Sequence, residues 1–162
     1  MKKVLFGVVA IAATFLVACG PTQDDAITFN DTLVELDEQA YEALTDYESA
    51  IYDGDMDEIE EKADEFQAKI TAGMDFIEAD SDFDGEFKDA AKGMFEAYQT
   101  SYDEYMPVMV EYWTKDWDEI TDELEEEEQD AYDNMNELID ERSEAFISAQ
   151  ETFAEEWDFI LE

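Results

Sequence analysis

Apolar residues recur at steps of three or four positions along most of this chain, and no other feature constrains its fold as strongly. Such stripes occupy residues 28–53, 56–79, 86–114 and 117–160. Steps of three and four place side chains on one face of an α-helix, which turns once in about 3.6 residues. Asp and Glu fill most of the remaining positions and suit a solvent-facing side. Each stretch is therefore predicted to form an amphipathic helix.

The apolar positions of each stripe define the face that we expect to be buried. In the first two helices they are Phe29, Leu33, Leu36, Ala40, Leu44, Tyr47 and Ile51, then Met56, Ile59, Ala63, Phe66, Ile70, Gly73 and Ile77. In the last two they are Phe87, Ala91, Met94, Tyr98, Tyr102, Tyr105, Met109 and Tyr112, then Ile120, Leu124, Ala131, Met135, Leu138, Arg142, Ala145, Ala149, Phe153 and Ile160. No stretch alternates as a β-strand would, so the fold class is predicted to be all-α.

Short breaks separate the stripes. Asp53-Gly54-Asp55 suits a helix end followed by a new helix start, and residues 80–86 form the next break. Short connections make consecutive helices antiparallel neighbours, which predicts an up-down-up-down four-helix bundle. We expect Thr28 to cap the first helix and Pro107 to kink the third. Residues 125–128, all glutamate, interrupt the fourth stripe and are predicted to project beyond the other helices.

The first twenty residues differ from the rest of the chain. Lys2 and Lys3 precede an apolar run over residues 4–18, which ends in Leu16-Val17-Ala18-Cys19. This order resembles the signal of a bacterial lipoprotein with its lipobox. The resemblance implies that residues 1–18 are cleaved and that Cys19 carries acyl chains such as palmitate. Residues 19–27 would then form a tether to the membrane, and Gly20 after the cysteine resembles cargo of the outer membrane, facing the periplasm or the outside.

The alternative for this segment is an uncleaved transmembrane helix with an incidental cysteine. The apolar run is about fifteen residues long, and a membrane-spanning helix needs about 20. It ends at Gly20-Pro21, which cannot continue a helix. The lipoprotein interpretation is therefore the stronger one.

The charge of the chain excludes several classes of partner. There are 48 Asp and Glu against 8 Lys and Arg, for a formal net charge of −40. Nucleic acids and anionic lipid headgroups would be repelled, so no nucleic-acid partner is expected. The 11 Phe, 8 Tyr and 3 Trp argue against disorder. Three meanings of the acidity remain open: a solvated surface in a saline habitat, a loose attraction for cations, or docking to a basic protein.

Residues suited to catalysis are scarce. The chain has no histidine, and its single cysteine is Cys19. This composition removes the commonest general base and metal ligand, together with Ser/His and Cys/His nucleophiles and di-iron sites built on Glu-x-x-His. We therefore predict a protein that is not an enzyme and holds no cofactor.

A calcium site is one candidate. Asp80, Asp82 and Asp84, followed by Gly85 and Glu86, match the first half of an EF-hand loop. The position of the bidentate glutamate is taken by an alanine, however, and a lysine falls at position nine. An ordinary interhelical turn is the competing interpretation.

An aromatic surface is the other candidate. Tyr98, Tyr102, Tyr105, Trp113 and Trp117 surround the junction of the third and fourth helices and are predicted to bind a partner. The competing interpretation places these rings in the bundle core. Arg142, the sole arginine, is expected to pack its stem at the stripe edge while its guanidinium reaches surface acids.

Several short motifs together resemble those of the small helical surface lipoproteins first recognised in leptospires. They are the lipobox ending at Cys19, Phe29-Asn30-Asp31, Phe83-Asp84-Gly85-Glu86-Phe87, the pair Tyr98 and Tyr102, and the region around Phe153. The resemblance implies a helical, lipid-anchored protein of the surface or periplasm, and it carries no activity. The expected role is envelope structure or partner binding, with low-affinity binding of calcium or other cations as the alternative.

Overall fold

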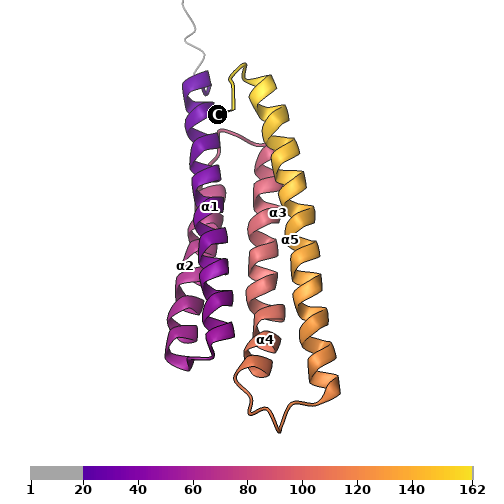
Figure 1. The fold of residues 1–162 in the computed structure, drawn as a ribbon. Coiled ribbons are helices and arrows are strands. Elements are labelled where there is room, and N and C mark those ends of the chain that lie inside the picture. The colour runs from indigo at the N-terminus through magenta and orange to yellow at the C-terminus, as the bar shows by residue number, and fades with distance from the viewer. Residues whose placement is uncertain (1–19, 162) are drawn as a thin grey trace, which may run out of the picture.

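The computed structural model describes residues 20–161, and every regular element among them is helical. The elements are α1 (Gln23–Asp53), α2 (Met56–Ala79), α3 (Glu86–Thr100), η1 (Ser101–Tyr105), α4 (Met106–Trp113) and α5 (Asp122–Glu156). Since α3, η1 and α4 form one continuous rod, residues 20–161 make four antiparallel rods (Figure 1). The predicted all-α four-helix bundle is confirmed.

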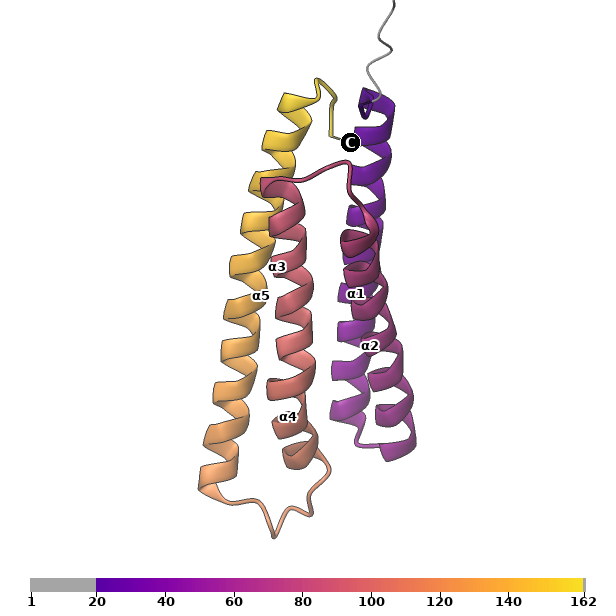
Figure 2. The same ribbon diagram turned by 180° about the vertical axis from the view of Figure 1, so that it is seen from behind.

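The rods associate mainly as two pairs. One pair is α1 with α2, and the other is the α3–α4 rod with α5; turning the molecule by 180° shows the same two pairs from behind (Figure 2). The apolar faces meet in one core, whose largest fully buried side chains are Tyr98, Phe66, Phe95, Leu33, Ile51, Ile70, Met106, Met109 and Met135. Among residues 20–161, none of the helices has the long apolar stretch needed to cross a bilayer.

The first helix starts earlier than the stripe indicated. Thr22 and Asp25 form a capping box, in which the Thr22 N–H donates to Asp25 Oδ2 (2.8 Å) and the Asp25 N–H donates to Thr22 Oγ1 (3.3 Å). Thr28, the expected cap, lies inside α1 and donates its hydroxyl to the Asp24 carbonyl. Residues 23–27 of the predicted tether are therefore helical. The predicted signal peptide, residues 1–18, and Cys19 lie outside the described residues.

The irregularity expected at Pro107 lies just before it. The η1 segment is one wide π-helical turn, closed by the Met106 N–H donating to the Ser101 carbonyl. Proline lacks an N–H, and its ring clashes with the carbonyl four residues earlier. A wider turn accommodates that carbonyl without ending the rod, which continues as α4 to Trp113.

The fourth stripe is placed differently from the prediction. The helix begins after Thr121, whose hydroxyl accepts from the Leu124 N–H at 3.2 Å, so residues 117–121 are not part of it. Ile139 and Phe146 are buried in place of Leu138 and Ala145, and Arg142 is exposed. Beyond the helix, Ile160 is 90% exposed. The buried residues of α5 are Leu124, Ala131, Met135, Ile139, Phe146, Ala149, Phe153 and Ala154.

We name the two ends of the bundle proximal and distal, according to where residue 20 and the C-terminal tail lie. The proximal end carries residue 20 and the C-terminal tail, which are tied together because the Gln23 side chain donates to the carbonyls of Trp157 and Asp158 (Figure 1). The distal end carries the α1–α2 turn and the connection 114–121.

Candidate functional site: an aromatic hollow at the distal end

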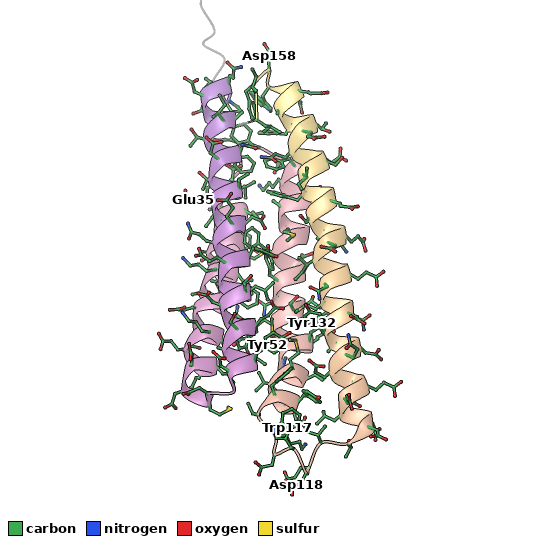
Figure 3. All side chains as sticks on the ribbon, viewed as in Figure 1. Glu35, Tyr52, Trp117, Asp118, Tyr132 and Asp158 are labelled. Atoms are coloured by element: carbon green, nitrogen blue, oxygen red, sulfur yellow. The ribbon has the colours of Figure 1, made fainter. Side chains whose placement is uncertain are left out.

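A hollow of about 160 Å³ opens at the distal end, between the α1–α2 turn and the connection that follows α4. We call it the distal hollow. It is lined by Tyr52, Asp53, Gly54, Tyr112, Trp113, Lys115, Trp117 and Ile120, so four of its eight lining residues are aromatic. Figure 3 shows Trp117 on the connection at the distal tip, with Tyr52 farther up the bundle.

The turn after α1 brings one wall of the hollow into place. Gly54 adopts the left-handed conformation (φ 72°) and its N–H donates to the carbonyls of Ala50 and Ile51. A Cβ atom at this position would lie 3.5 Å from the Trp113 carbonyl oxygen. Because glycine accepts positive φ without strain, the turn can end α1 tightly and still lie against the end of α4.

The aromatic rings of the hollow are arranged nearly at right angles. The Tyr52 and Trp113 ring centroids lie 4.9 Å apart at 84°, and those of Tyr112 and Trp113 lie 5.5 Å apart at 77°. The Trp113 indole Nε1 donates to Glu128 of α5 at 3.0 Å. Trp113 is therefore held by contacts to α1 and α5, whereas Trp117 is 79% exposed.

Acidic groups dominate the electrostatics around these rings. Burial, with the nearby charges of Glu48 and Glu128 adding to it, raises the pKa of Tyr52 to about 12, so its hydroxyl stays neutral. Lys115 forms an ion pair with Glu111 at 2.8 Å, and this bond raises the pKa of the lysine. The positive charge that lines the hollow is thus already partnered.

The five aromatic residues singled out from the sequence separate into two groups. Trp113 and Trp117 line the distal hollow, as expected of a surface site. Tyr98 is fully buried in the core, whereas Tyr102 is half-buried and packs against the core beside Tyr47 and Phe66. Tyr105 is half-buried and packs against the core.

Tyr52 lines the hollow but was not among the candidate residues singled out from the sequence. It lies two positions before Gly54, at the end of the first predicted helix. In an antiparallel bundle this turn must lie beside the end of the third helix, so the topology combined with the aromatic residue could have identified it.

Tyr98 forms a hydrogen bond with Asp37 that joins two helices in the middle of the bundle. Its hydroxyl donates to Asp37 Oδ1 at 2.9 Å. Burial raises the pKa of Asp37, and the hydrogen bond from Tyr98 opposes that shift. Burial and the Asp37 carboxylate both raise the pKa of Tyr98. The pair joins α1 to α3 and satisfies two polar groups that the core partly desolvates.

The predicted calcium residues do not converge. Asp80 Oδ1 accepts from the backbone N–H groups of Asp82 (3.1 Å) and Phe83 (2.9 Å), which is a turn contact. Lys88 donates to the Asp80 carbonyl and to Asp84 Oδ1 (3.3 Å), so its ammonium lies inside the loop. Within residues 20–161, no group of three or more acidic side chains is placed to hold a metal, and Asp82, Asp84 and Glu86 are exposed.

Comparisons with protein-family models, with curated proteins and with solved structures found no match to this chain. The resemblance to leptospiral surface lipoproteins therefore stays a prediction.

Proposed function

We propose that this protein is a lipid-anchored, strongly acidic, non-enzymatic component of the bacterial envelope that binds a basic protein through its distal end. One observation carries the proposal. Four of the seven large apolar residues exposed in residues 20–161 lie at the distal end: Tyr52, Met56, Trp113 and Trp117. An apolar cluster on an otherwise acidic surface is typical of an interaction site.

The position of the anchor supports this assignment. Residue 20 lies at the proximal end, directly after the predicted lipidated Cys19. The helix α1 then runs for 31 residues to the distal turn, which at about 1.5 Å per residue is about 45 Å. Acyl chains on Cys19 would hold the proximal end at the membrane, and the distal hollow would face away from it.

The charge supports a basic partner. A surface with a formal net charge of −40 repels other acidic proteins and attracts basic ones at a distance. Complementary charge mainly raises the association rate, while buried aromatic anchors at the centre of an interface contribute much of the affinity. The distal end combines both properties.

The anchor is tested with Cys19→Ser. Cells grown with radiolabelled palmitate should label the wild-type chain, and the variant should lose the label and appear as an unprocessed or a soluble form. Circular dichroism of the variant should keep its helical signal. Label remaining on the variant would contradict lipidation at this residue.

The distal partner site is tested by crosslinking in living cells with two matched variants. Trp117→Ser removes an exposed ring of the distal hollow, whereas Ile147→Ser removes an exposed apolar side chain of α5 (50% exposed) away from it. We expect the protein crosslinked by the wild type to be kept by Ile147→Ser, to be lost from Trp117→Ser, and to have a basic sequence. Equal crosslinking by both variants would overturn the distal assignment.

A further inference from the structure

We propose that the distal hollow holds the guanidinium group of an arginine side chain on the basic partner. This inference rests on the proposed function and names the chemical group that the hollow recognises. Three observations support it: the aromatic lining of the hollow, the acidic residues around it, and the ion pair that already partners Lys115.

The lining favours a cation. Tyr52, Tyr112, Trp113 and Trp117 surround a space of about 160 Å³. The face of an aromatic ring carries a negative quadrupole and attracts a positive group held against it, and indole attracts best. Since Tyr52 and Tyr112 each stand nearly perpendicular to Trp113, the planes of the lining rings have more than one orientation. An uncharged apolar ligand would gain only burial from this arrangement.

The surroundings attract positive charge as well. Asp53 lines the hollow, and Glu128 accepts the indole N–H of Trp113. The connection that carries Trp117 adds Asp116, Asp118 and Glu119, all exposed, and Asp118 lies beside Trp117 at the tip (Figure 3). The one cationic side chain among the lining residues, Lys115, is paired with Glu111 at 2.8 Å.

The carboxylate in the wall selects among cations. A guanidinium is flat, stacks on an indole or phenol ring, and presents five N–H donors to acceptors at its edge. Asp53 supplies such an acceptor, and the rings supply the stacking faces. A quaternary ammonium has no donor and forms no hydrogen bond with Asp53, while a primary ammonium is compact, strongly hydrated and stacks poorly.

The probe is N-acetyl-arginine amide, added to the full-length ¹⁵N-labelled protein purified in detergent. The chain has 3 Trp, and their indole N–H signals report on both ends of the bundle. Trp113 and Trp117 line the distal hollow, whereas Trp157 packs against Phe83 at the proximal end and serves as an internal control. Salt of roughly 0.5 M shortens the screening length to about 4 Å and suppresses diffuse attraction to the acidic surface.

We expect the Trp113 and Trp117 signals to shift along a saturable curve while Trp157 stays in place. N-acetyl-lysine amide and tetramethylammonium should bind at least about threefold more weakly, since each lacks either stacking or donors. Equal shifts of all the indole signals, or an equal response to sodium chloride, would show diffuse charge attraction and overturn the proposal. Equal binding of tetramethylammonium would overturn the selection for guanidinium.

Two lysine variants distinguish a cation site from a general charge effect. Lys115→Gln removes the positive charge from the wall of the hollow, and arginine amide should then bind about two- to threefold more tightly. Lys92 of α3 is the matched control, since it pairs with a glutamate four residues away, as Lys115 pairs with Glu111 of α4. Lys92→Gln makes the same change in net charge and should leave the affinity unchanged. Equal strengthening by both variants would contradict a local site.

The outcomes separate this inference from the proposed function. Loss of the crosslink in Trp117→Ser with no binding of arginine amide would mean that the partner inserts an apolar group, and the guanidinium assignment would fall alone. Saturable binding of arginine amide with a crosslink that survives Trp117→Ser would keep the cation site and overturn the distal partner site.

Discussion

The two ends of this bundle use aromatic rings in opposite ways. At the proximal end, Phe29, Phe83, Phe87 and Phe153 contact one another, with centroid separations from 4.9 to 6.0 Å, and all four are buried. At the distal end, Tyr52, Trp113 and Trp117 are exposed around a hollow. Both ends join the same rods, so the helices themselves do not explain the difference.

The connecting segments explain it. The α2–α3 loop supplies Phe83, and the tail after α5 supplies Trp157 and Phe159, which pack on Phe153 and cover the proximal rings. The distal connection 114–121 is mostly polar, and its two large apolar residues, Trp117 and Ile120, line the hollow. An aromatic ring near the end of a bundle therefore becomes core only where a loop contributes an apolar side chain to cover it.

The largest expected effect comes from removing a ring at each end. Phe87→Ala leaves a cavity among the proximal rings and should lower the free energy of unfolding by about 3–5 kcal/mol. Trp117→Ala removes a ring that is 79% exposed and should change it by no more than about 0.5 kcal/mol. Urea unfolding followed by circular dichroism measures both. Similar losses at the two sites would show that the distal rings are core after all.

Substitution of Gly73 tests how closely the Phe95 ring packs against α2. A Cβ atom at Gly73 of α2 would lie 2.1 Å from the Phe95 ring, so Gly73→Ala should cost about 1–3 kcal/mol through displacement of that ring. At Gly93 of α3 the nearest atom would be the Arg142 Cδ, at 3.8 Å.

Gly93→Ala is the matched control for that change. Both glycines are inside helices, and alanine has the better helix propensity by about 1 kcal/mol. We therefore expect Gly93→Ala to raise the unfolding midpoint and Gly73→Ala to lower it. Two shifts of the same sign would contradict the close contact with Phe95.

Between the two ends, the pair of half-buried Asp37 and buried Tyr98 makes stability depend on pH. Because burial raises the pKa of Asp37 above 3.8 in the folded state, the native protein holds this proton to higher pH than the unfolded chain. Its contribution is fully present below the unfolded value and is lost as pH rises through the folded pKa. Asp37→Asn removes the charge and keeps an oxygen acceptor for the Tyr98 hydroxyl.

The variant should therefore be more stable than the wild type at pH 7, and its advantage should shrink as the pH falls toward 3. Asp64→Asn, at an exposed acid of α2, controls for the general loss of negative charge. Unfolding free energies across this range measure the difference. An advantage that is independent of pH, or equal in the two variants, would contradict a pKa of Asp37 raised by partial burial.

The sequence predicted the architecture because apolar steps of three and four persist through every rod. It grouped Trp113 and Trp117 with Tyr98 as one aromatic candidate surface, with the bundle core as the alternative, because all of them lie near the junction of the third and fourth helices. Burial there depends on which segments cover each end, and spacing along one helix carries no such information. The errors in α5 lie in the middle of the helix, where the stripe took Leu138 and Ala145 although the next residues, Ile139 and Phe146, are the buried ones. Steps of three and of four both keep a residue on one helix face, so spacing alone does not decide between two adjacent apolar positions.

The smallest effect is expected from adding calcium. The reason lies in the different positions of Lys88 at the proximal end and Lys115 at the distal end. Lys88 points into the proximal loop and donates to the Asp80 carbonyl and to Asp84, whereas Lys115 beside the distal hollow is paired with Glu111. A cation must displace the ammonium of Lys88 and break the turn contacts of Asp80 before it can bind the proximal loop. Calorimetric titration with calcium should give diffuse heats that salt suppresses, unchanged in Asp82→Ala. One saturable site that Asp82→Ala abolishes would show instead that the proximal loop rearranges to bind metal. Specific cation binding would then not be confined to the distal hollow.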